Sequence, residues 1–210
     1  MSRAGQRSEA ATRANVIDAA VASILELGFY RASSNEIARR AGVTWGVIQH
    51  YFGTREALML AVLQDHARKF TEMVEGATIE GATVEERLAR LLDLFAAHYG
   101  QPQYLATMQI LLNMDHDPRT SADVRATMRA VAETTNDHVR RLLREVLGPA
   151  TAVPDLATTV FLALRGFVVS QQLLETLTYD LVAPHSDRVA RQRRLFAEAM
   201  APYLEMAARR

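Results

Sequence analysis

The residues between Thr44 and Tyr51 include side chains suited to hydrogen bonding with the edges of DNA bases. A glutamine can form two hydrogen bonds with adenine, and histidine or tyrosine can reach a phosphate or a base edge. An indole offers one donor and a large apolar face, and a glycine allows close backbone approach. The residues concerned are Thr44, Trp45, Gly46, Gln49, His50 and Tyr51.

Helical spacing places most of these residues on one face. Ile48 and Phe52 lie one turn apart and are expected to face inward. Trp45, Gly46, Gln49 and His50 then share the outward face. In a helix-turn-helix protein the second helix lies in the major groove with its N-terminal residues at the base edges. The segment therefore predicts a DNA-reading helix.

Two further residues are expected to position the DNA backbone. Ser33 is followed three residues later by Glu36, a capping box in which each side chain satisfies the other residue's backbone amide. Arg55 opens the next helix, where its charge and the free amides of the helix N-terminus favour phosphate. These residues predict phosphate contacts on both sides of the reading helix.

Local signals define the helices that hold these side chains. A helix over about 12–27 ends at Gly28, and one over 34–41 ends at Gly42. Thr44 opens the reading helix, and Thr54 caps a fourth helix that ends near residue 75. Two short helices around a tight glycine-containing turn form the helix-turn-helix pattern.

The rest of the chain also predicts helices, and no strand signal competes with them. We therefore expect an all-α protein with a helix-turn-helix domain over residues 1–56 and a helical bundle over 57–210. The apolar excess of the helix over 155–179 requires cover on several sides. The later expected helices cover about 83–99, 102–114, 121–147, 155–179 and 186–208.

Composition excludes several classes of function. The 210 residues contain no cysteine, so disulfides, thiolate metal sites and thiol catalysis are excluded. We expect no membrane segment, because no run of about 18 apolar residues occurs, and a cytoplasmic location. No metal-binding spacing, catalytic triad or phosphate loop is present, so we expect no metal, no cofactor and no enzyme. The first 55 residues hold seven arginines and four acids, a net charge of +3 that favours an anionic partner.

Several short elements follow one another between Arg13 and Leu58: Gly28-Phe29-Tyr30, Glu36-Ile37-Ala38, Ala41-Gly42-Val43-Thr44, Gly46, His50-Tyr51-Phe52 and Arg55-Glu56-Ala57-Leu58. In their order and spacing they resemble the TetR family of regulators. This likeness implies a three-helix DNA-binding domain, a ligand domain, and a homodimer formed through the helices at about 155–179 and 186–208. It also implies a repressor that binds a palindromic operator and is released by a small, partly apolar effector. Trp45, Gln49 and Ser34 depart from the residues common in the family, which indicates altered operator preference.

The effector site is less defined by sequence. Arg165 interrupts an apolar helix, so it requires an acidic partner within the protein or an anionic ligand. Each of the other candidates could instead be ordinary core. The candidates are Phe95, His98, Tyr99, Met108, Leu112, Met128 and Arg165.

Two alternatives remain open at this stage. The chain could be a helical small-molecule-binding protein whose head no longer binds DNA, because Trp45 and Gln49 replace phosphate-binding residue types. At the N-terminus, Arg3, Arg7 and Arg13 could form a disordered tail or an arm that reaches a minor groove.

Overall fold

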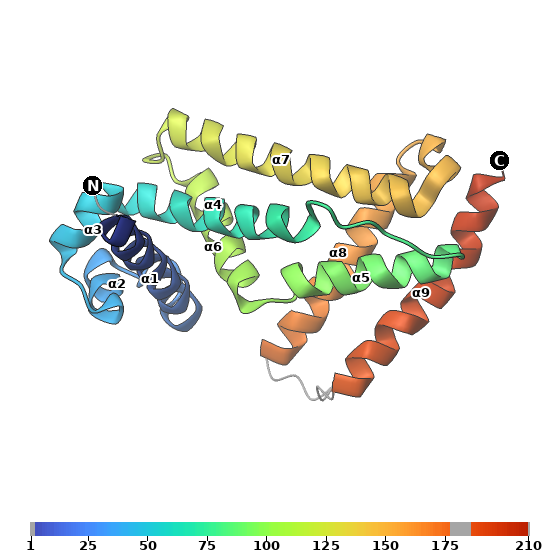
Figure 1. Ribbon diagram of the computed structural model, residues 1–210, viewed down its shortest axis with the longest axis horizontal. Coiled ribbons are helices and arrows are strands. Elements are labelled where there is room, and N and C mark those ends of the chain that lie inside the picture. Colours follow the sequence, from blue (N-terminus) through green and yellow to red (C-terminus); the bar gives the residue numbers. More distant parts are fainter. Residues whose placement is uncertain (1–2, 177–185, 210) are drawn as a thin grey trace. The chain divides into compact units, whose positions relative to one another are not determined.

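The computed structural model describes residues 3–176 and 186–209, and within these ranges the protein is all-helical (Figure 1). The described residues form nine α-helices and one short 3-10 helix. The α-helices are α1 (Arg3–Leu27), α2 (Ser34–Ala41), α3 (Trp45–Phe52), α4 (Arg55–Val74), α5 (Val84–Tyr99), α6 (Pro102–His116), α7 (Ala122–Leu147), α8 (Leu156–Thr176) and α9 (Ser186–Ala208). The 3-10 helix η1 covers Gly148–Ala152. The expected all-α fold is confirmed.

Packing divides the chain into two compact units. The first contains Met1–Lys69 and Pro102–Glu133, and the second contains Phe70–Gln101 and Thr134–Arg210. Helices α4 and α7 therefore contribute residues to both units. The domain boundary expected after residue 56 lies inside the first unit. The division into a DNA-binding domain and an effector domain at that residue stays a prediction.

The first unit is held together by a core shared among α1 to α4 and α6. Ile24, Ile37 and Ile48 are fully buried and come from three different helices. Met59 of α4 and Ile110 of α6 join the same cluster. Burial of such side chains contributes about 1.5–3 kcal/mol each. This core holds the short helices α2 and α3 in position, since helices of eight residues are marginal in isolation.

Glycines end the first helices where the sequence predicts. Gly28 and Gly42 have φ angles of 83° and 66°, values that side chains disfavour. The amide of Gly28 donates to the carbonyl of Ile24, and the amide of Gly42 donates to that of Arg39. These caps determine where the chain turns between α1, α2 and α3.

The N-terminal end of α1 differs from the expectation. The helix begins at Arg3 rather than near residue 12, so the described backbone there is helical, and a minor-groove contact by Arg3, Arg7 and Arg13 stays a prediction. Ala10 and Ala11 favour the helix, and the Thr12 hydroxyl donates to the carbonyl of Ser8 at 2.9 Å. The side chains of Arg3 and Arg7 lie outside the described residues.

The second unit packs α5 against α8 and α9. Phe70, Leu91 and Phe95 are fully buried in it. Arg141 of α7 fastens the segment after α4, donating to the carbonyls of Val74 at 2.6 Å and Ala77 at 3.0 Å. These contacts connect the end of α4 to α7 within one unit.

Helix α8 is apolar along most of its length. The stretch Leu156–Leu174 has a mean hydropathy of 1.3 and is long and apolar enough to cross a membrane by length and composition. The sequence-based expectation of no such run did not anticipate this. Core helices of soluble proteins pass the same test, so the result is weak evidence for a membrane. The expected end of this helix at residue 179 lies outside the described residues.

Candidate nucleic-acid interface

Helices α2 and α3 form a helix-turn-helix on the surface of the first unit. Only Gly42, Val43 and Thr44 separate them. The amide of Val43 donates to the carbonyl of Ala38 at 3.0 Å, which closes the turn tightly. The side chain of Ile48 is fully buried and packs α3 against the core of the first unit. The opposite side of α3 is therefore presented outward.

The outward side of α3 carries polar groups that the protein leaves accessible. Gln49 and His50 are exposed, and Thr44 is exposed at the N-cap position. The Thr44 hydroxyl makes no capping hydrogen bond, although the sequence suggested that it caps the helix. The Thr44 hydroxyl and the Gln49 amide are therefore both accessible as donors and acceptors.

Gly46 lies on this face without a reason inside the fold. A Cβ added there would meet only the Thr44 Oγ1 atom, at an ordinary contact distance of 3.7 Å. Glycine is unfavourable in a helix relative to alanine. A glycine that neither space nor backbone conformation requires indicates a need for close approach from outside.

Trp45 corrects the helical-wheel interpretation. Its side chain is half-buried and packs against the core of the first unit, so it does not face fully outward. Phe52 is likewise only partly buried, and the Arg13 guanidinium lies 4.7 Å from its ring centre. Tyr51 is half-buried, with its ring 5.2 Å from that of His50. One part of the Trp45 indole thus packs against the core, and another part stays accessible to solvent.

The capping box at Ser33 forms only on one side. The Ser33 hydroxyl accepts a hydrogen bond from the Glu36 amide at 3.3 Å. The Glu36 carboxylate, however, binds arginines instead of the Ser33 amide, which donates to the carbonyl of Arg31. Ser33 is exposed and keeps its hydroxyl proton available for an acceptor such as phosphate.

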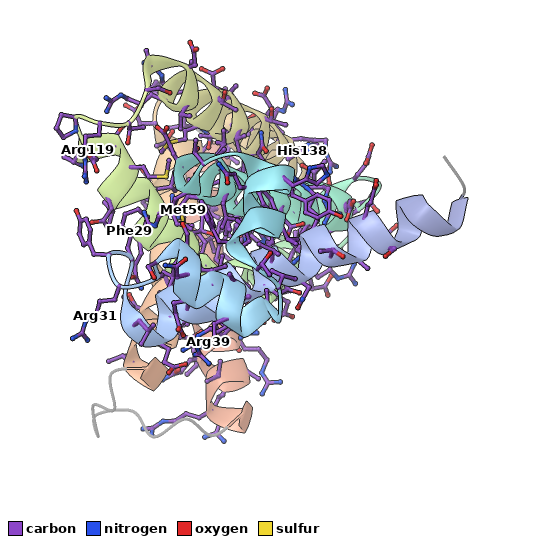
Figure 2. The ribbon with its side chains drawn as sticks, turned by 90° about the vertical axis from the view of Figure 1, so that its left-hand side faces the viewer. Phe29, Arg31, Arg39, Met59, Arg119 and His138 are labelled. Carbon is purple, nitrogen blue, oxygen red and sulfur yellow. The ribbon has the colours of Figure 1, made fainter. Side chains whose placement is uncertain are left out.

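Exposed arginines beside Ser33 were not singled out by the sequence reasoning. Arg31 and Arg39 are exposed, and Arg31 points away from the protein (Figure 2). Arg31 lies just before α2 and Arg39 lies within it, on the helix-turn-helix that a DNA backbone would approach. Their closeness to Ser33 in the sequence was the signal that could have identified them.

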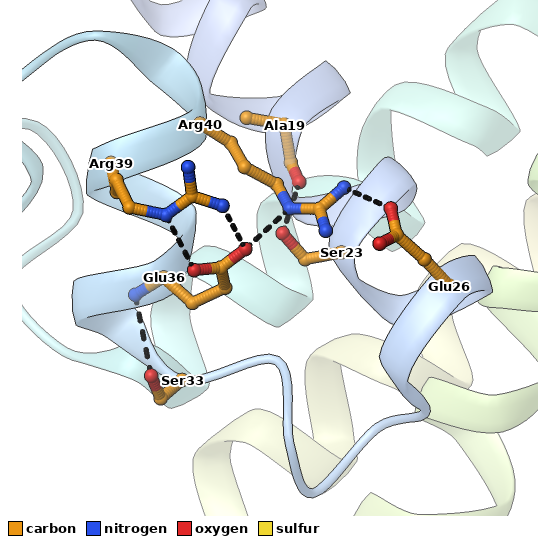
Figure 3. Close-up of polar contacts among 7 residues, drawn as sticks. All are labelled: Ala19, Ser23, Glu26, Ser33, Glu36, Arg39 and Arg40. Carbon is orange, nitrogen blue, oxygen red and sulfur yellow. Dashed lines mark hydrogen bonds and ion pairs between the residues drawn. The ribbon is translucent and has the colours of Figure 1, made fainter.

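Glu36 is the centre of a charge network that joins α1 to α2 (Figure 3). Its carboxylate accepts hydrogen bonds from Nε and Nη2 of Arg39 at 2.8 and 2.7 Å, and from Nε of Arg40 at 2.6 Å. Arg40 also contacts Glu26 of α1 at 2.6 Å. Hydrogen bonds from Arg39 and then Arg40 lower the pKa of Glu36 to about 2. The network holds Arg39 in a defined orientation at the surface.

Arg55 opens α4 as expected, but its side chain bonds to the backbone of the α1–α2 turn. Its Nε donates to the carbonyl of Ala32 at 3.2 Å, and its Nη2 donates to that of Phe29 at 2.5 Å. The guanidinium also lies 4.4 Å from the centre of the Phe29 ring. Burial, and then the charge of Arg119, lower the pKa of Arg55. These contacts brace the α1–α2 turn, and the phosphate contact expected for Arg55 stays a prediction.

The expected effector residues are divided between the two units. In the second unit, the Tyr99 ring lies 5.3 Å from Phe95, 4.8 Å from His98 and 5.8 Å from the Arg165 guanidinium carbon. The other three candidates belong to the first unit. There Met128 is buried, Met108 is half-buried and Leu112 is 58% exposed. The structure brings together only the first set of four.

Comparison with known proteins gives consistent matches. A sequence model described as bacterial regulatory proteins, tetR family, matches residues 16–62. The HTH-type transcriptional regulator BetI of Cronobacter sakazakii is 30% identical over 136 residues, which cover 62% of this chain and 67% of BetI. The fatty acid metabolism regulator protein of Bacillus subtilis is 35% identical over 77 residues, which cover 37% of this chain and 40% of that relative.

Solved structures share the fold. The crystal structure of FadR from Bacillus subtilis in complex with stearoyl-CoA has a TM-score of 0.62 and 20% identity, and the match covers 89% of this chain and 96% of FadR. FadR from Bacillus halodurans has a TM-score of 0.63 and 20% identity, with 90% of this chain and 94% of FadR covered.

Proposed function

This chain belongs to the TetR family of bacterial regulatory proteins, and from that premise we propose that it is a ligand-responsive repressor acting as a homodimer. As a family member it is a transcriptional regulator and not an enzyme. The proposal is that the dimer binds a palindromic operator in the cytoplasm and that a small, partly apolar effector releases it. The observation that carries the proposal is the accessible polar face of α3.

We propose a division of roles on that face. Gln49 forms paired hydrogen bonds with a base edge, most favourably adenine, and the exposed Thr44 and His50 contact neighbouring bases or phosphates. Gly46 allows the helix backbone to approach the groove. Ser33 and the accessible part of Tyr51 contact the phosphate backbone.

The homodimer is supported by apolar side chains exposed on α8 and α9. Leu162 of α8 is 60% exposed, and Leu195 and Tyr203 of α9 are 55% and 54% exposed. Only 28% of the apolar stretch of α8 is buried within this chain. An apolar helix face of this kind requires cover, and a symmetric dimer covers it with a second copy of itself.

Dimerisation also explains how an effector could act on DNA binding. Two reading helices must reach successive major grooves about 34–36 Å apart. Displacing one reading helix from its groove therefore removes all the contacts of that helix with the DNA. We place the effector beside Phe95, His98, Tyr99 and Arg165, where aromatic rings and one guanidinium meet. The FadR structure contains stearoyl-CoA, so a long-chain acyl-CoA is the first compound to test.

The first experiment measures binding of the purified protein to the DNA upstream of its own gene. We expect Gln49→Ala to weaken binding to the operator at least tenfold while binding to unrelated DNA stays unchanged. The control is Gln64→Ala, because Gln64 is an exposed glutamine of α4 in the same unit. If the wild type binds neither this DNA nor a randomised pool, the repressor proposal is wrong and a sensing protein with an inactive head replaces it.

A second experiment tests the dimer by analytical ultracentrifugation. Leu162→Glu should shift the protein from dimer to monomer, because it places a charge in the proposed apolar interface. Leu112→Glu is the matched control, since Leu112 of α6 is 58% exposed but lies outside that face. If both variants dimerise equally, Leu162 is not part of the interface and the proposed interface is wrong.

A further inference from the structure

The first unit contains a cavity that none of the roles above uses. It has a volume of about 360 Å³, within the range of small-molecule sites. It is lined by the α1–α2 turn, the beginning of α4 and the segment between α6 and α7. Figure 2 labels three of its lining residues, Phe29, Met59 and Arg119.

One part of the cavity wall is apolar. Phe29, Met59 and Met114 line it, and all three side chains are buried. The methionines are flexible and polarisable, so they adapt to ligands of different shapes. This surface favours a hydrocarbon or aromatic group.

The two arginines that line the cavity differ in whether a carboxylate balances their charge. Arg119 is neutralised by Asp117, with contacts of 2.8 and 3.0 Å. Glu56 accepts a hydrogen bond from the Ser121 amide at 2.8 Å. Arg55 donates only to backbone carbonyls, and none of the described residues places a carboxylate within 4.0 Å of it.

Arg55 therefore carries a half-buried positive charge with no counter-ion among the described residues. A charge removed from water is costly unless an opposite charge compensates it. The direction of its pKa shift agrees, since burial and the charge of Arg119 both lower the pKa of Arg55. A negative group on the cavity side of Arg55 would relieve this cost.

We propose that the cavity binds a small anionic amphiphile, with a carboxylate beside Arg55 and Arg119 and a short apolar group against Phe29, Met59 and Met114. The bound molecule would connect the α1–α2 turn to the segment between α6 and α7. It is a second input to the DNA-binding head, separate from the effector site proposed in the second unit. A phosphate group shares the anionic chemistry but lacks the apolar part.

The test follows the methionine methyl groups by NMR, in the full protein and without DNA, so that its outcome does not depend on operator binding. Met59→Leu and Met114→Leu assign the two cavity signals. We expect octanoate to shift both signals saturably, whereas octanol and inorganic phosphate at the same concentration do not. Shifts confined to Met73 or Met200 of the second unit would overturn the proposal, as would equal shifts with octanol or phosphate.

A charge reversal tests the anion contact without disturbing the fold. Arg119 is 84% exposed in its side chain, so Arg119→Glu should fold normally and raise the dissociation constant for octanoate at least tenfold. Arg140→Glu is the control, because Arg140 is a similarly exposed arginine that pairs with Asp137 in the second unit. Equal octanoate affinities of the two variants would contradict the placement of the carboxylate.

Discussion

Replacing Gly46 with alanine should stabilise the protein and weaken its binding to DNA. The added Cβ would lie 3.7 Å from Thr44 Oγ1, and the backbone of Gly46 is not in the left-handed region. Alanine favours a helix over glycine by up to about 1 kcal/mol. For a chain of this length, that change corresponds to a melting temperature about 2–4 °C higher.

The expected loss of binding comes from the same methyl group. If α3 lies in the major groove with Gly46 against the DNA, the methyl group prevents the closest approach, and we expect at least a tenfold loss of operator affinity. Thermal unfolding measures the first effect, and fluorescence anisotropy with labelled operator DNA measures the second. Gly42→Ala is the control, because Gly42 has a φ of 66° and alanine there should lower stability by roughly 1–2 kcal/mol.

Two results would refute the reasoning. A lower melting temperature for Gly46→Ala would mean that a Cβ at this position meets a closer contact than the 3.7 Å to Thr44 Oγ1. A higher melting temperature together with wild-type operator affinity would mean that the helix does not approach DNA at this residue.

Three other predictions concern the first unit. Burial, and then the charge of Lys69, lower the pKa of His66 from 6.5 to about 4, so stability is complete above pH 6.5 and should fall by about 2 kcal/mol by pH 5. Urea unfolding should show that His66→Gln lacks this decline, and an equal decline in both proteins would contradict it. Arg55→Met should lower the free energy of unfolding by about 1–3 kcal/mol through loss of its bonds to the α1–α2 turn, whereas unchanged stability with uniformly weaker DNA binding would restore a phosphate role. The lowered pKa of Glu36 means that its contribution is present above pH 4.5 and lost as the pH falls towards 2, so thermal unfolding of Glu36→Gln should vary less with pH in that range than that of the wild type.

Local signals in the sequence were enough to predict the helices around the reading face. Gly28 and Gly42 end helices through backbone conformations that few other residues adopt, and this is visible in the sequence alone. Thr54 caps α4 as predicted, accepting a hydrogen bond from the Ala57 amide at 3.0 Å. These features depend on residues at most four positions apart.

The partners of charged and aromatic side chains could not be predicted in this way. Arg55 binds carbonyls 23 and 26 residues earlier in the chain, and nothing in its neighbours indicates that choice. Trp45 lies on the outward side of a helical wheel, but a wheel treats the helix as isolated and does not include the core beside it. The Glu36 carboxylate was expected to bind the Ser33 amide, but it binds Arg39 and Arg40 on the next turn of the helix instead.

The discontinuous first unit has a consequence for synthesis on the ribosome. Helix α1 packs against α6, and the Phe29 amide donates to Gln109 Oε1 at 3.1 Å, so α6 must be available before the packing of the head is complete. Translation proceeds at about 5–20 residues per second. The segment from Pro102 to Glu133 is therefore finished roughly 3–13 seconds after Lys69. During that interval the part of α1 that packs against α6 lacks this partner, and a fragment ending at residue 56 would keep that part exposed.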